Sequence, residues 1–408
     1  MKAACMICNT TYGMDTSPMR YTCNCGGLLQ LVQDFSGIDA ELLKRQFHER
    51  RAERHTLMAS GVWRYKELIA PELPDPFIVT RNEGNTGLYE TELVRSFTGV
   101  RRLWLKAQSE NPSGSFKDNG MTAAVSHGRS LGYQKFACTS TGNTSSSLAM
   151  YAATAGLASV VLVPDRDVAL NKVLQTLAYG AQVRTFTGTY DDGIRWLDKY
   201  AEAEGLYVCN SINPFRIEGQ KSIVYELAQD MNWMLPDWIV LPGGALSNAS
   251  ALGKGLHDLY TLGFIDKLPR IAVIQAEGAS PFHRMVESGA DTLTPETNPS
   301  TIASALNIGN PPSWRKALGV LQLTNGVTAA VSDNEIMLAK QQLDRSGIGA
   351  EPASAAAVAG LRKLVNEGII HPDETAACII TGHLLKDSDA LRMYLDLPEC
   401  IQHVQLQS

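Results

Sequence analysis

The chain has 408 residues, of which 44% are hydrophobic and 19% are charged, and its formal net charge at pH 7 is -6. This length exceeds the size at which a single core keeps growing, so we expect two or more domains. The acidic balance and the lack of a basic run argue against nucleic acid as a partner and favour small-molecule ligands. No apolar stretch is long enough to span a bilayer, and the cysteine-rich first residues are unlike a signal peptide, so we expect a cytosolic protein.

Four of the eight cysteines lie within the first 25 residues, as Cys5-x-x-Cys8 and Cys23-x-Cys25. Structural zinc is typically held by four thiolates from two such pairs, each in a tight turn called a knuckle. The second pair is one residue shorter than this pattern, so two interpretations stay open: a zinc ribbon, and a small β-ribbon that packs without metal, which we favour. The later cysteines stand mostly in apolar runs and are expected to be buried, unreactive thiols: Cys138, Cys209, Cys378 and Cys400.

From residue 77 onward, short runs rich in valine, isoleucine and leucine alternate with longer helical patterns. A charged helix is expected before this region, over 39–54, followed by chain-breaking prolines at positions 71, 74 and 76. The alternation is typical of βαβ units, and it predicts an α/β fold whose parallel sheets are covered by helices on both faces. The expected strands span 102–106, 135–138, 159–163, 182–186, 206–209, 238–241, 270–274 and 376–380.

The stretch from Ser109 to Gly120 places one lysine, Lys117, among small residues, between the expected strand 102–106 and a helical pattern over 120–132. Strand-to-helix junctions are where α/β folds bind ligands. A lysine amine attacks carbonyl groups only when desolvation or a neighbouring cation lowers its pKa, and the partly apolar segment 113–116 could desolvate it. We therefore predict that Lys117 is a Schiff-base lysine; the alternative is a surface lysine at the start of a helix.

Two loops rich in glycine and small polar residues follow expected strands. The loop 139–147 precedes the apolar helix 148–155, so its amides and hydroxyls gather at a helix N-terminus, which favours a carboxylate or phosphate site over a simple cap. The loop from Gly243 to Asn248 repeats this arrangement after the strand 238–241, and its glycines allow a phosphate to approach the backbone. Its spacing matches neither the nucleoside-triphosphate loop nor the dinucleotide fingerprint.

Two further loops carry candidate ligand groups. The segment 210–221 holds Arg216, which could grip an anion with two hydrogen bonds, but a solvated charged turn explains the same residues equally. Thr381 follows the strand 376–380, where its hydroxyl could bond a ring nitrogen, whereas His383 is interpreted as structural. Two anion sites, one imine-forming lysine and one hydroxyl for a ring nitrogen match the needs of pyridoxal 5'-phosphate.

Several segments agree in order and spacing with one known family. They are Pro112-Ser-Gly-Ser-Phe-Lys117-Asp, Ser140-Thr-Gly-Asn143-Thr-Ser, Asn210-Ser-x-Asn-Pro-x-Arg216-Ile-Glu-Gly-Gln-Lys221, Glu351-Pro-Ala-Ser and Thr381-Gly-His383. Together with Arg81-Asn-Glu-Gly-Asn-Thr86 and the opening cysteines, they make nearly the whole chain resemble the threonine synthase family. Single motifs also occur in serine and threonine dehydratases and in cysteine synthase, which are the close alternatives.

The resemblance implies two doubly wound α/β domains of pyridoxal-phosphate fold type II with a small N-terminal cysteine ribbon. The implied limits are a ribbon over 1–30, a large cofactor-binding domain over 31–118 with 205–408, and a small domain over 119–204. The implied activity is that of a homodimeric lyase, which converts O-phospho-L-homoserine and water to L-threonine and phosphate by γ-elimination and β-addition. A threonine or serine dehydratase, a related β- or γ-replacement enzyme and a non-catalytic cofactor-binding homologue remain alternatives.

By the same resemblance, each candidate residue has a role. Lys117 is expected to form the Schiff base with the cofactor and to act as the catalytic base. The residues expected to hold the cofactor are Lys117, Asn143, Gly243, Gly244, Ala245, Leu246, Ser247, Asn248 and Thr381. Those expected to hold the substrate are Ser140, Thr141, Asn143, Thr144, Ser211 and Arg216. If the ribbon binds zinc, the ligands are Cys5, Cys8, Cys23 and Cys25.

Three residues depart from the family pattern. Ala245 and Ser247 stand where asparagine and glycine are usual in the phosphate loop, and Leu384 stands where a glycine is common. An asparagine amide is lost as a hydrogen-bond donor at the first position, and the Ser247 hydroxyl can compensate for it. The departures bear on the identity of the substrate, so a related substrate also stays open.

Overall fold

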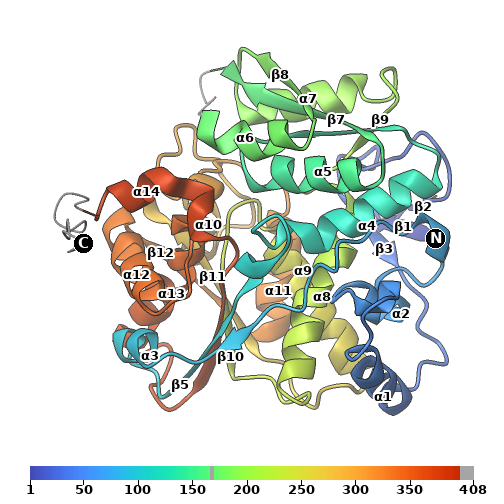
Figure 1. Ribbon diagram of the computed structural model, residues 1–408. Coiled ribbons are helices and arrows are strands. Elements are labelled where there is room, and N and C mark those ends of the chain that lie inside the picture. The colour runs from blue at the N-terminus through green and yellow to red at the C-terminus, as the bar shows by residue number, and fades with distance from the viewer. Residues whose placement is uncertain (166–169, 396–408) are drawn as a thin grey trace, which may run out of the picture.

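The computed structural model describes residues 1–165 and 170–395, and the strands of this part of the chain form three sheets (Figure 1). An antiparallel ribbon near the N-terminus has the order β2-β1-β3 and consists of β1 (Lys2–Cys5), β2 (Thr11–Gly13) and β3 (Leu29–Val32). A six-stranded sheet, β12-β11-β10-β13-β5-β4, consists of β4 (Leu88–Tyr89), β5 (Arg102–Lys106), β10 (Trp238–Pro242), β11 (Arg270–Ala276), β12 (Val327–Val331) and β13 (Thr375–Ile379). A four-stranded sheet, β8-β7-β6-β9, consists of β6 (Lys135–Thr139), β7 (Ala158–Pro164), β8 (Gln182–Phe186) and β9 (Leu206–Val208).

The two larger sheets are parallel except at one edge, where the short strand β4 runs antiparallel to β5. Every strand expected from the sequence is present, with ends shifted by two residues or fewer. The predicted α/β fold, with two parallel sheets and an N-terminal cysteine ribbon, is therefore confirmed. The apolar runs predicted these strands because a parallel sheet is covered on both faces and so needs apolar side chains on both.

Helices connect the strands and cover the sheets. Those before the first parallel strand of the larger sheet are α1 (Ala40–Arg50), α2 (Lys66–Ile69) and α3 (Glu92–Thr98). The next are α4 (Lys117–Ser130), α5 (Asn143–Thr154), α6 (Leu170–Ala178), α7 (Tyr190–Tyr200), α8 (Pro214–Asp230) and α9 (Ser247–Thr261). The last are α10 (Pro281–Ser288), α11 (Trp314–Thr324), α12 (Asp333–Arg345), α13 (Pro352–Asn366) and α14 (Ser388–Arg392).

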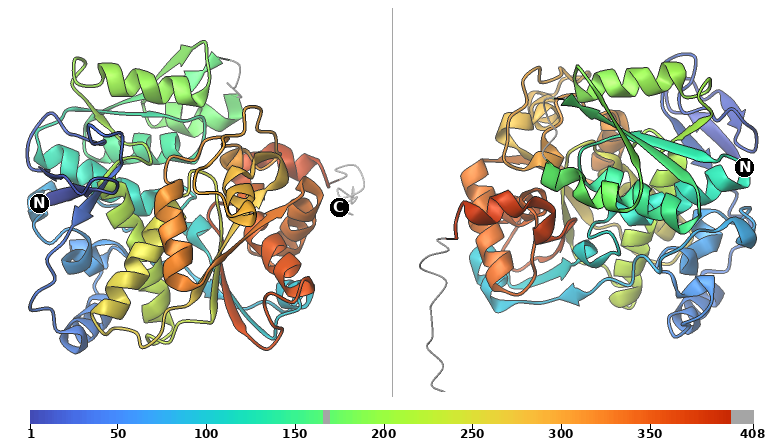
Figure 2. Two further views of the ribbon diagram at one scale, coloured as in Figure 1. Left: turned by 180° about the vertical axis from the view of Figure 1, so that it is seen from behind. Right: turned by 45° about the horizontal axis from the view of Figure 1, so that its top comes forward.

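The central strand β10 shows how each sheet separates two cores. Ile239 and Leu241 are buried in a cluster with residues of α8, α9 and α11. Trp238 and Val240, which point to the opposite face, are buried with residues of α12 and α13. Successive side chains of a strand point to opposite faces, so one apolar run supplies both layers. Figure 2 shows the helices on either side of the larger sheet from two further directions.

The carboxyl ends of the parallel strands carry the starts of four helices. Each of these helices begins shortly after a strand ends: α4 follows β5, α5 follows β6, α8 follows β9 and α9 follows β10. In open α/β sheets, ligands bind in the crevice outside these strand ends. The loops that the sequence singled out occupy these connections, and this common location is what allows them to meet.

The three described cysteines outside the ribbon are buried and form no disulfide: Cys138, Cys209 and Cys378. Burial raises the pKa of Cys138 to about 12, which keeps its thiol protonated at neutral pH. Their predicted burial is confirmed, whereas Cys400 lies outside the described residues. No helix in the described part of the chain is long and apolar enough to cross a membrane.

The expected domain limits at 30, 118 and 204 stay a prediction. The strands of the sheets run slightly beyond two of them, because β3 ends at Val32 and β9, which pairs with β6 of the smaller sheet, ends at Val208. The charged helix expected over 39–54 is α1, which begins after the capping residue Asp39 and ends at Arg50.

Candidate active site

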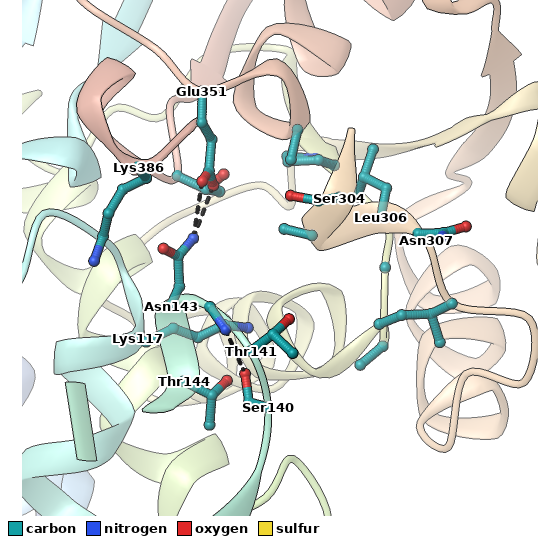
Figure 3. A pocket seen from close by; sticks show the side chains of 18 of the residues that line it. Lys117, Ser140, Thr141, Asn143, Thr144, Ser304, Leu306, Asn307, Glu351 and Lys386 are labelled. Atoms are coloured by element: carbon teal, nitrogen blue, oxygen red, sulfur yellow. Dashed lines mark hydrogen bonds between the residues drawn. The ribbon is translucent and has the colours of Figure 1, made fainter. Parts of the chain in front are cut away.

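A pocket of about 570 Å³ lies where the loops after β6, β9, β10 and β13 converge. It is lined by Lys117, by residues of the segment 301–308, and by residues of the loops that follow these four strands. Figure 3 shows Lys117, Ser140 and Thr144 on one side, Glu351 opposite Asn143, and the segment with Ser304 and Asn307 closing another side. Of the residues predicted to hold cofactor or substrate, this pocket is lined by Lys117, Ser140, Thr141, Asn143, Thr144, Ser211, Arg216, Gly244, Ala245, Leu246, Ser247, Asn248 and Thr381.

Lys117 is the first residue of α4, which confirms its expected position between a strand and a helix. The preceding loop is held by the carboxylate of Asp118, which accepts hydrogen bonds from the Ser113 amide (2.7 Å) and hydroxyl (2.6 Å). The Ser147 hydroxyl on α5 donates a third hydrogen bond to Asp118, at 2.5 Å. Asp118 therefore ties α5 to the loop that carries Lys117. All three groups donate to this one buried carboxylate, which helps to fix the loop.

The Lys117 amine lies 4.2 Å from the centroid of the Phe116 ring and faces the pocket. Burial, and next the charge of Arg216, lower the pKa of this amine to about 7, against an ordinary value of 10.5. Glu351 acts in the opposite direction but does not cancel these effects. Both causes expected from the sequence, desolvation and a neighbouring cation, are thus present. A large share of the amine is neutral, and hence nucleophilic, near pH 7.

The loop after β6 forms the start of α5. The helix has no side-chain cap at Gly142, whose amide instead donates to the Ser140 hydroxyl at 3.2 Å. Ser140, Thr141 and Thr144 all line the pocket. Uncapped amides at a helix start favour an anion, so this loop has the character of the predicted anion site.

The loop after β10 leads into α9, which also begins without a side-chain cap. Leu246 precedes the helix with φ of 64°, a left-handed conformation that L residues adopt at a cost. The Asn248 side chain is buried, and neither its amide nitrogen nor its oxygen has a hydrogen-bond partner among the described residues. Such an unsatisfied buried amide at a pocket wall calls for a polar ligand.

The two glycines of this loop differ in position, and only Gly244 lies where both were expected. Gly243 does not line the pocket; its amide donates to Ile274 at 2.7 Å and its carbonyl accepts from Gln275 at 2.9 Å, so it continues the sheet. Gly244 lines the pocket, and its φ is not positive. A Cβ at Gly244 would lie 2.7 Å from the Ala305 carbonyl oxygen, so close approach of the segment 301–308 requires this glycine.

The segment 210–221 is not a solvated turn, because Pro214 begins α8 and the residues that follow are buried. Arg216 donates one hydrogen bond from Nη1 to the Cys209 carbonyl, at 3.0 Å. Its Nε and Nη2, and the hydroxyl of Ser211, are buried at the pocket without a partner within the described chain. Lys221 faces away from the pocket and pairs with Asp258 at 2.8 Å. Of the two interpretations, the structure supports the anion grip.

The loop after β13 places Thr381 in the pocket wall, with its hydroxyl 2.8 Å from that of Ser354. His383 lies outside the pocket lining and accepts a hydrogen bond from the Leu385 amide through Nδ1, as a helix cap. Its structural interpretation is therefore supported. Leu384 packs against Gly349, where an added Cβ would lie 1.8 Å from the leucine side chain. The leucine at this position therefore fits because residue 349, which does not line the pocket, is a glycine.

Several residues that line the pocket had no role assigned from the sequence, among them the charged residues Glu351 and Lys386. Glu351 precedes α13, and its carboxylate accepts both hydrogen bonds of the Asn143 side-chain nitrogen. Lys386 donates to the Ser146 hydroxyl at 2.9 Å and to Gln175. Burial raises the pKa of Glu351 and lowers that of Lys386. Glu351 was visible only as part of a motif, because it precedes a helix and does not follow a strand. Lys386 lies in the loop after β13, where only Thr381 was given a role.

The pocket therefore holds Lys117 together with unpaired polar groups of Asn248, Ser211 and Arg216. Comparisons with known proteins identify its family. Residues 79–382 match the family described as pyridoxal-phosphate dependent enzyme. The threonine synthase of Methanosarcina acetivorans is 44% identical over 387 residues, which cover 94% of this chain and 91% of the relative. The threonine synthase of Methanocaldococcus jannaschii is 42% identical over 391 residues, which cover 96% of this chain and 94% of the relative.

Among solved structures, threonine synthase from Escherichia coli superposes with a TM-score of 0.74 and covers 98% of this chain and 93% of its own. At 16% sequence identity, this likeness shows a shared fold alone. The relatives that are 42% and 44% identical span nearly the whole chain and share one name. The chain therefore belongs to the pyridoxal-phosphate-dependent enzymes and, among them, to the threonine synthase family.

Proposed function

We propose that this chain is a threonine synthase, a lyase that converts O-phospho-L-homoserine and water to L-threonine and phosphate with pyridoxal 5'-phosphate as cofactor. The observation that carries the proposal is the position of Lys117. Its amine shares one pocket with the uncapped start of α9 on one hand and with the unpaired donors of Arg216 and Ser211 on the other. A cofactor phosphate and a substrate phosphate need two such anion sites.

The residues of the α9 loop fit the cofactor phosphate. Backbone amides at an uncapped helix start bind phosphate well, and the buried Asn248 amide lacks any other partner in the described chain. Gly244 keeps the loop free of a side chain where the segment 301–308 approaches. We assign the cofactor phosphate to Gly244–Asn248, the ring hydroxyl to Asn143, and the ring nitrogen to the Thr381 hydroxyl. Gly243 supports this loop from the sheet.

The substrate phosphate is assigned to the unpaired donors of Arg216 and Ser211. Arg216 has Nε and Nη2 available, a pair of donors that suits bidentate binding of a phosphate, and the Ser211 hydroxyl lines the same pocket. With Thr144 they are proposed to hold the substrate γ-phosphate. Ser140, Thr141 and Asn143 at the start of α5 are proposed to hold the substrate carboxylate.

Lys117 is the proposed base. With a pKa of about 7, the amine is available in its neutral form at physiological pH and can accept a proton from Cα and later from Cβ. Pyridoxal 5'-phosphate, when bound, supplies the conjugated electron sink that makes these hydrogens acidic. Arg216, Ser211 and Thr144 hold the phosphate as it leaves Cγ. Lys117 gives one proton to Cγ and, after the hydroxyl of water has added at Cβ, returns one to Cα. The remaining proton of water goes to the released phosphate.

The test is to incubate the full chain and pyridoxal 5'-phosphate with O-phospho-L-homoserine and to measure phosphate and amino acids together. We expect equal amounts of phosphate and L-threonine. Formation of a 2-oxo acid and ammonia from threonine or serine instead identifies a dehydratase. The variant Arg216→Gln should raise KM for the phosphorylated substrate more than it lowers kcat, because the arginine binds the same phosphate before and during the reaction.

We also propose that the protein acts on this small molecule as a homodimer in the cytosol. Sedimentation of the purified chain at several concentrations tests the dimer. A monomer at all concentrations contradicts it.

A further inference from the structure

The four N-terminal cysteines lie close together in the ribbon, although Cys8 and Cys25 are 17 positions apart in the sequence. The Sγ atoms of Cys5, Cys8, Cys23 and Cys25 all lie within 4.8 Å of one another. Three of the pairs are separated by 3.4 Å (Cys5–Cys25), 3.4 Å (Cys8–Cys25) and 3.5 Å (Cys8–Cys23). All four are free cysteines, so no disulfide explains their proximity.

These separations match those of a tetrahedral metal site. Four sulfurs at about 2.3 Å from one zinc ion lie about 3.8 Å from each other. Because the four sulfurs lie this close to one another, a single ion can contact all of them. Four thiolates without a carboxylate or imidazole are the ligand set of structural zinc, and a closed set of four protein ligands leaves no position for a substrate.

The backbone of the ribbon is built for this convergence. In the second pair the Cys23 amide donates to the Gly27 carbonyl and the Gly26 amide donates to the Cys23 carbonyl, each at 2.8 Å. Gly26 has φ of +82°, which closes this tight turn. A Cβ at Gly27 would lie 2.5 Å from the Cys5 sulfur, so only glycine permits the turn to approach the first pair. The shortened second knuckle therefore does not prevent the sulfurs from meeting.

Further donors already point at the sulfurs. The Ile7 amide lies 3.4 Å from the Cys5 Sγ, and the Tyr12 hydroxyl lies 3.1 Å from the Cys23 Sγ. Hydrogen bonds to ligand sulfurs stabilise thiolates and orient them toward a metal. We propose that Cys5, Cys8, Cys23 and Cys25 bind one structural zinc ion. This reverses the preference for a metal-free ribbon, which had rested on the spacing of the second pair alone.

The ribbon is bound to the helices that carry the active site. His127 on α4 lies 2.9 Å from the Met14 carbonyl through Nε2 and 2.9 Å from the Tyr207 hydroxyl through Nδ1. Burial lowers the pKa of His127 to about 4, so the ring is neutral and can donate to Met14 from Nε2 while it accepts from Tyr207. Helix α4 begins at Lys117. Loss of metal is thus expected to loosen a contact on the helix that positions the reactive lysine.

Two lysines, of which Lys316 is buried and Lys254 half-buried, hold the last strand of the ribbon in place. Lys316 on α11 donates to the Leu29 carbonyl at 3.0 Å, and Lys254 on α9 donates to the Leu31 carbonyl at 2.8 Å. None of the four cysteines lines the pocket. Figures 1 and 2 show the N-terminus on the side of the molecule away from α14 in all three views. The proposed zinc therefore stabilises the fold and takes no part in the chemistry.

The first test measures metal in the full chain, purified without chelators. We expect one zinc per chain by mass spectrometry. We also expect that cobalt(II), added to chelator-treated protein under reducing conditions, gives the thiolate charge-transfer and visible bands of tetrahedral cobalt, and that one equivalent of zinc abolishes them. A chain with reduced thiols that takes up neither zinc nor cobalt overturns the proposal, whatever any variant does.

The second test compares variants. The double variant Cys5→Ser/Cys8→Ser should bind no zinc and unfold at a lower temperature, whereas Cys378→Ala, which removes a buried thiol elsewhere, should keep one zinc per chain. In the folded fraction of the double variant, the visible absorbance of bound cofactor should persist, because the site lies outside the pocket. If this variant keeps one zinc per chain, the ligands are wrong. Failure of the proposed threonine synthase activity leaves this result untouched.

Discussion

Asn143 at the start of α5 and Glu351 before α13 are joined across the pocket: the Asn143 side-chain nitrogen donates to both carboxylate oxygens of Glu351, at 2.9 and 3.0 Å. The contact links the smaller sheet's helix to the larger sheet's helix. Glu351 is itself fixed by its amide, which donates to the Gly382 carbonyl at 3.0 Å. The carboxylate therefore sets the orientation of the amide that we assign to the cofactor ring.

The first prediction concerns this pair. Asn143→Ala and Glu351→Ala should each weaken cofactor affinity by roughly ten- to a hundred-fold, since hydrogen bonds to charged groups contribute about 1.5 to 3 kcal/mol. The double variant should bind the cofactor with about the affinity of whichever single variant binds it less tightly. The reason is that the two side chains act through one contact. Titration of the apoprotein with pyridoxal 5'-phosphate measures all three. Strictly additive losses would show that Glu351 does not act through Asn143.

The second prediction tests which lysine carries the cofactor. Lys316 is a matched competitor, because burial lowers its pKa to about 7 as well, yet it donates to the Leu29 carbonyl and does not line the pocket. Lys117→Ala should lose turnover and all borohydride-fixed cofactor, whereas Lys316→Ala should still fix one cofactor per folded chain. Peptide mapping after borohydride reduction decides, and label on any lysine other than Lys117 contradicts the assignment.

The third prediction is a pH dependence. Only the neutral amine attacks an aldehyde, and the Lys117 pKa of about 7 means that the neutral fraction rises as pH increases through 7. The rate of cofactor capture by apoprotein should therefore be low at pH 6, half-maximal at about pH 7 and level above about pH 8. Stopped-flow absorbance measures it. A midpoint near the ordinary value of 10.5 would show that the amine is not perturbed.

Replacement of Arg216 provides the control for that midpoint. The arginine charge disfavours the protonated amine, so Arg216→Met should move the midpoint to higher pH. Glu351 acts in the other direction, so Glu351→Gln should move it to lower pH. Shifts of opposite sign distinguish these charges from a general change in pocket structure, which has no reason to reverse its sign.

The fourth prediction concerns the loop before α9. Ser247→Ala should weaken cofactor affinity by roughly ten- to a hundred-fold if the hydroxyl donates to the phosphate, by the same range of about 1.5 to 3 kcal/mol. Gly244→Val should be more damaging, because its side chain would meet the Ala305 carbonyl oxygen. Cofactor titration of each apoprotein tests this, with unfolding temperature as a check on folding. Normal affinity in both variants would place the phosphate at the loop 139–147.

The strands and the position of Lys117 could be predicted because they depend on local patterns. The apolar run 102–106 is β5, and the helical spacing after Lys117 is α4. In contrast, the sequence of the segment 210–221 fits an anion site and a solvated turn equally well. Only the structure shows that α8 buries both Arg216 and Lys221. Arg216 then faces the pocket and Lys221 pairs with Asp258, a difference that depends on which face of the helix meets which neighbour.

Residue types and their order along the chain were enough to indicate an α/β enzyme with a reactive lysine and two anion sites, because strand periodicity, glycine loops and helix starts are local properties. Three features needed the tertiary structure. The pairing of Asn143 with Glu351 spans 208 residues. Gly243 proved to be hydrogen-bonded to β11, whereas Gly244 lines the pocket. The four cysteine sulfurs meet in spite of a shortened second pair. In each case, distances between residues far apart in the chain are set by packing and turn geometry, which local patterns do not encode.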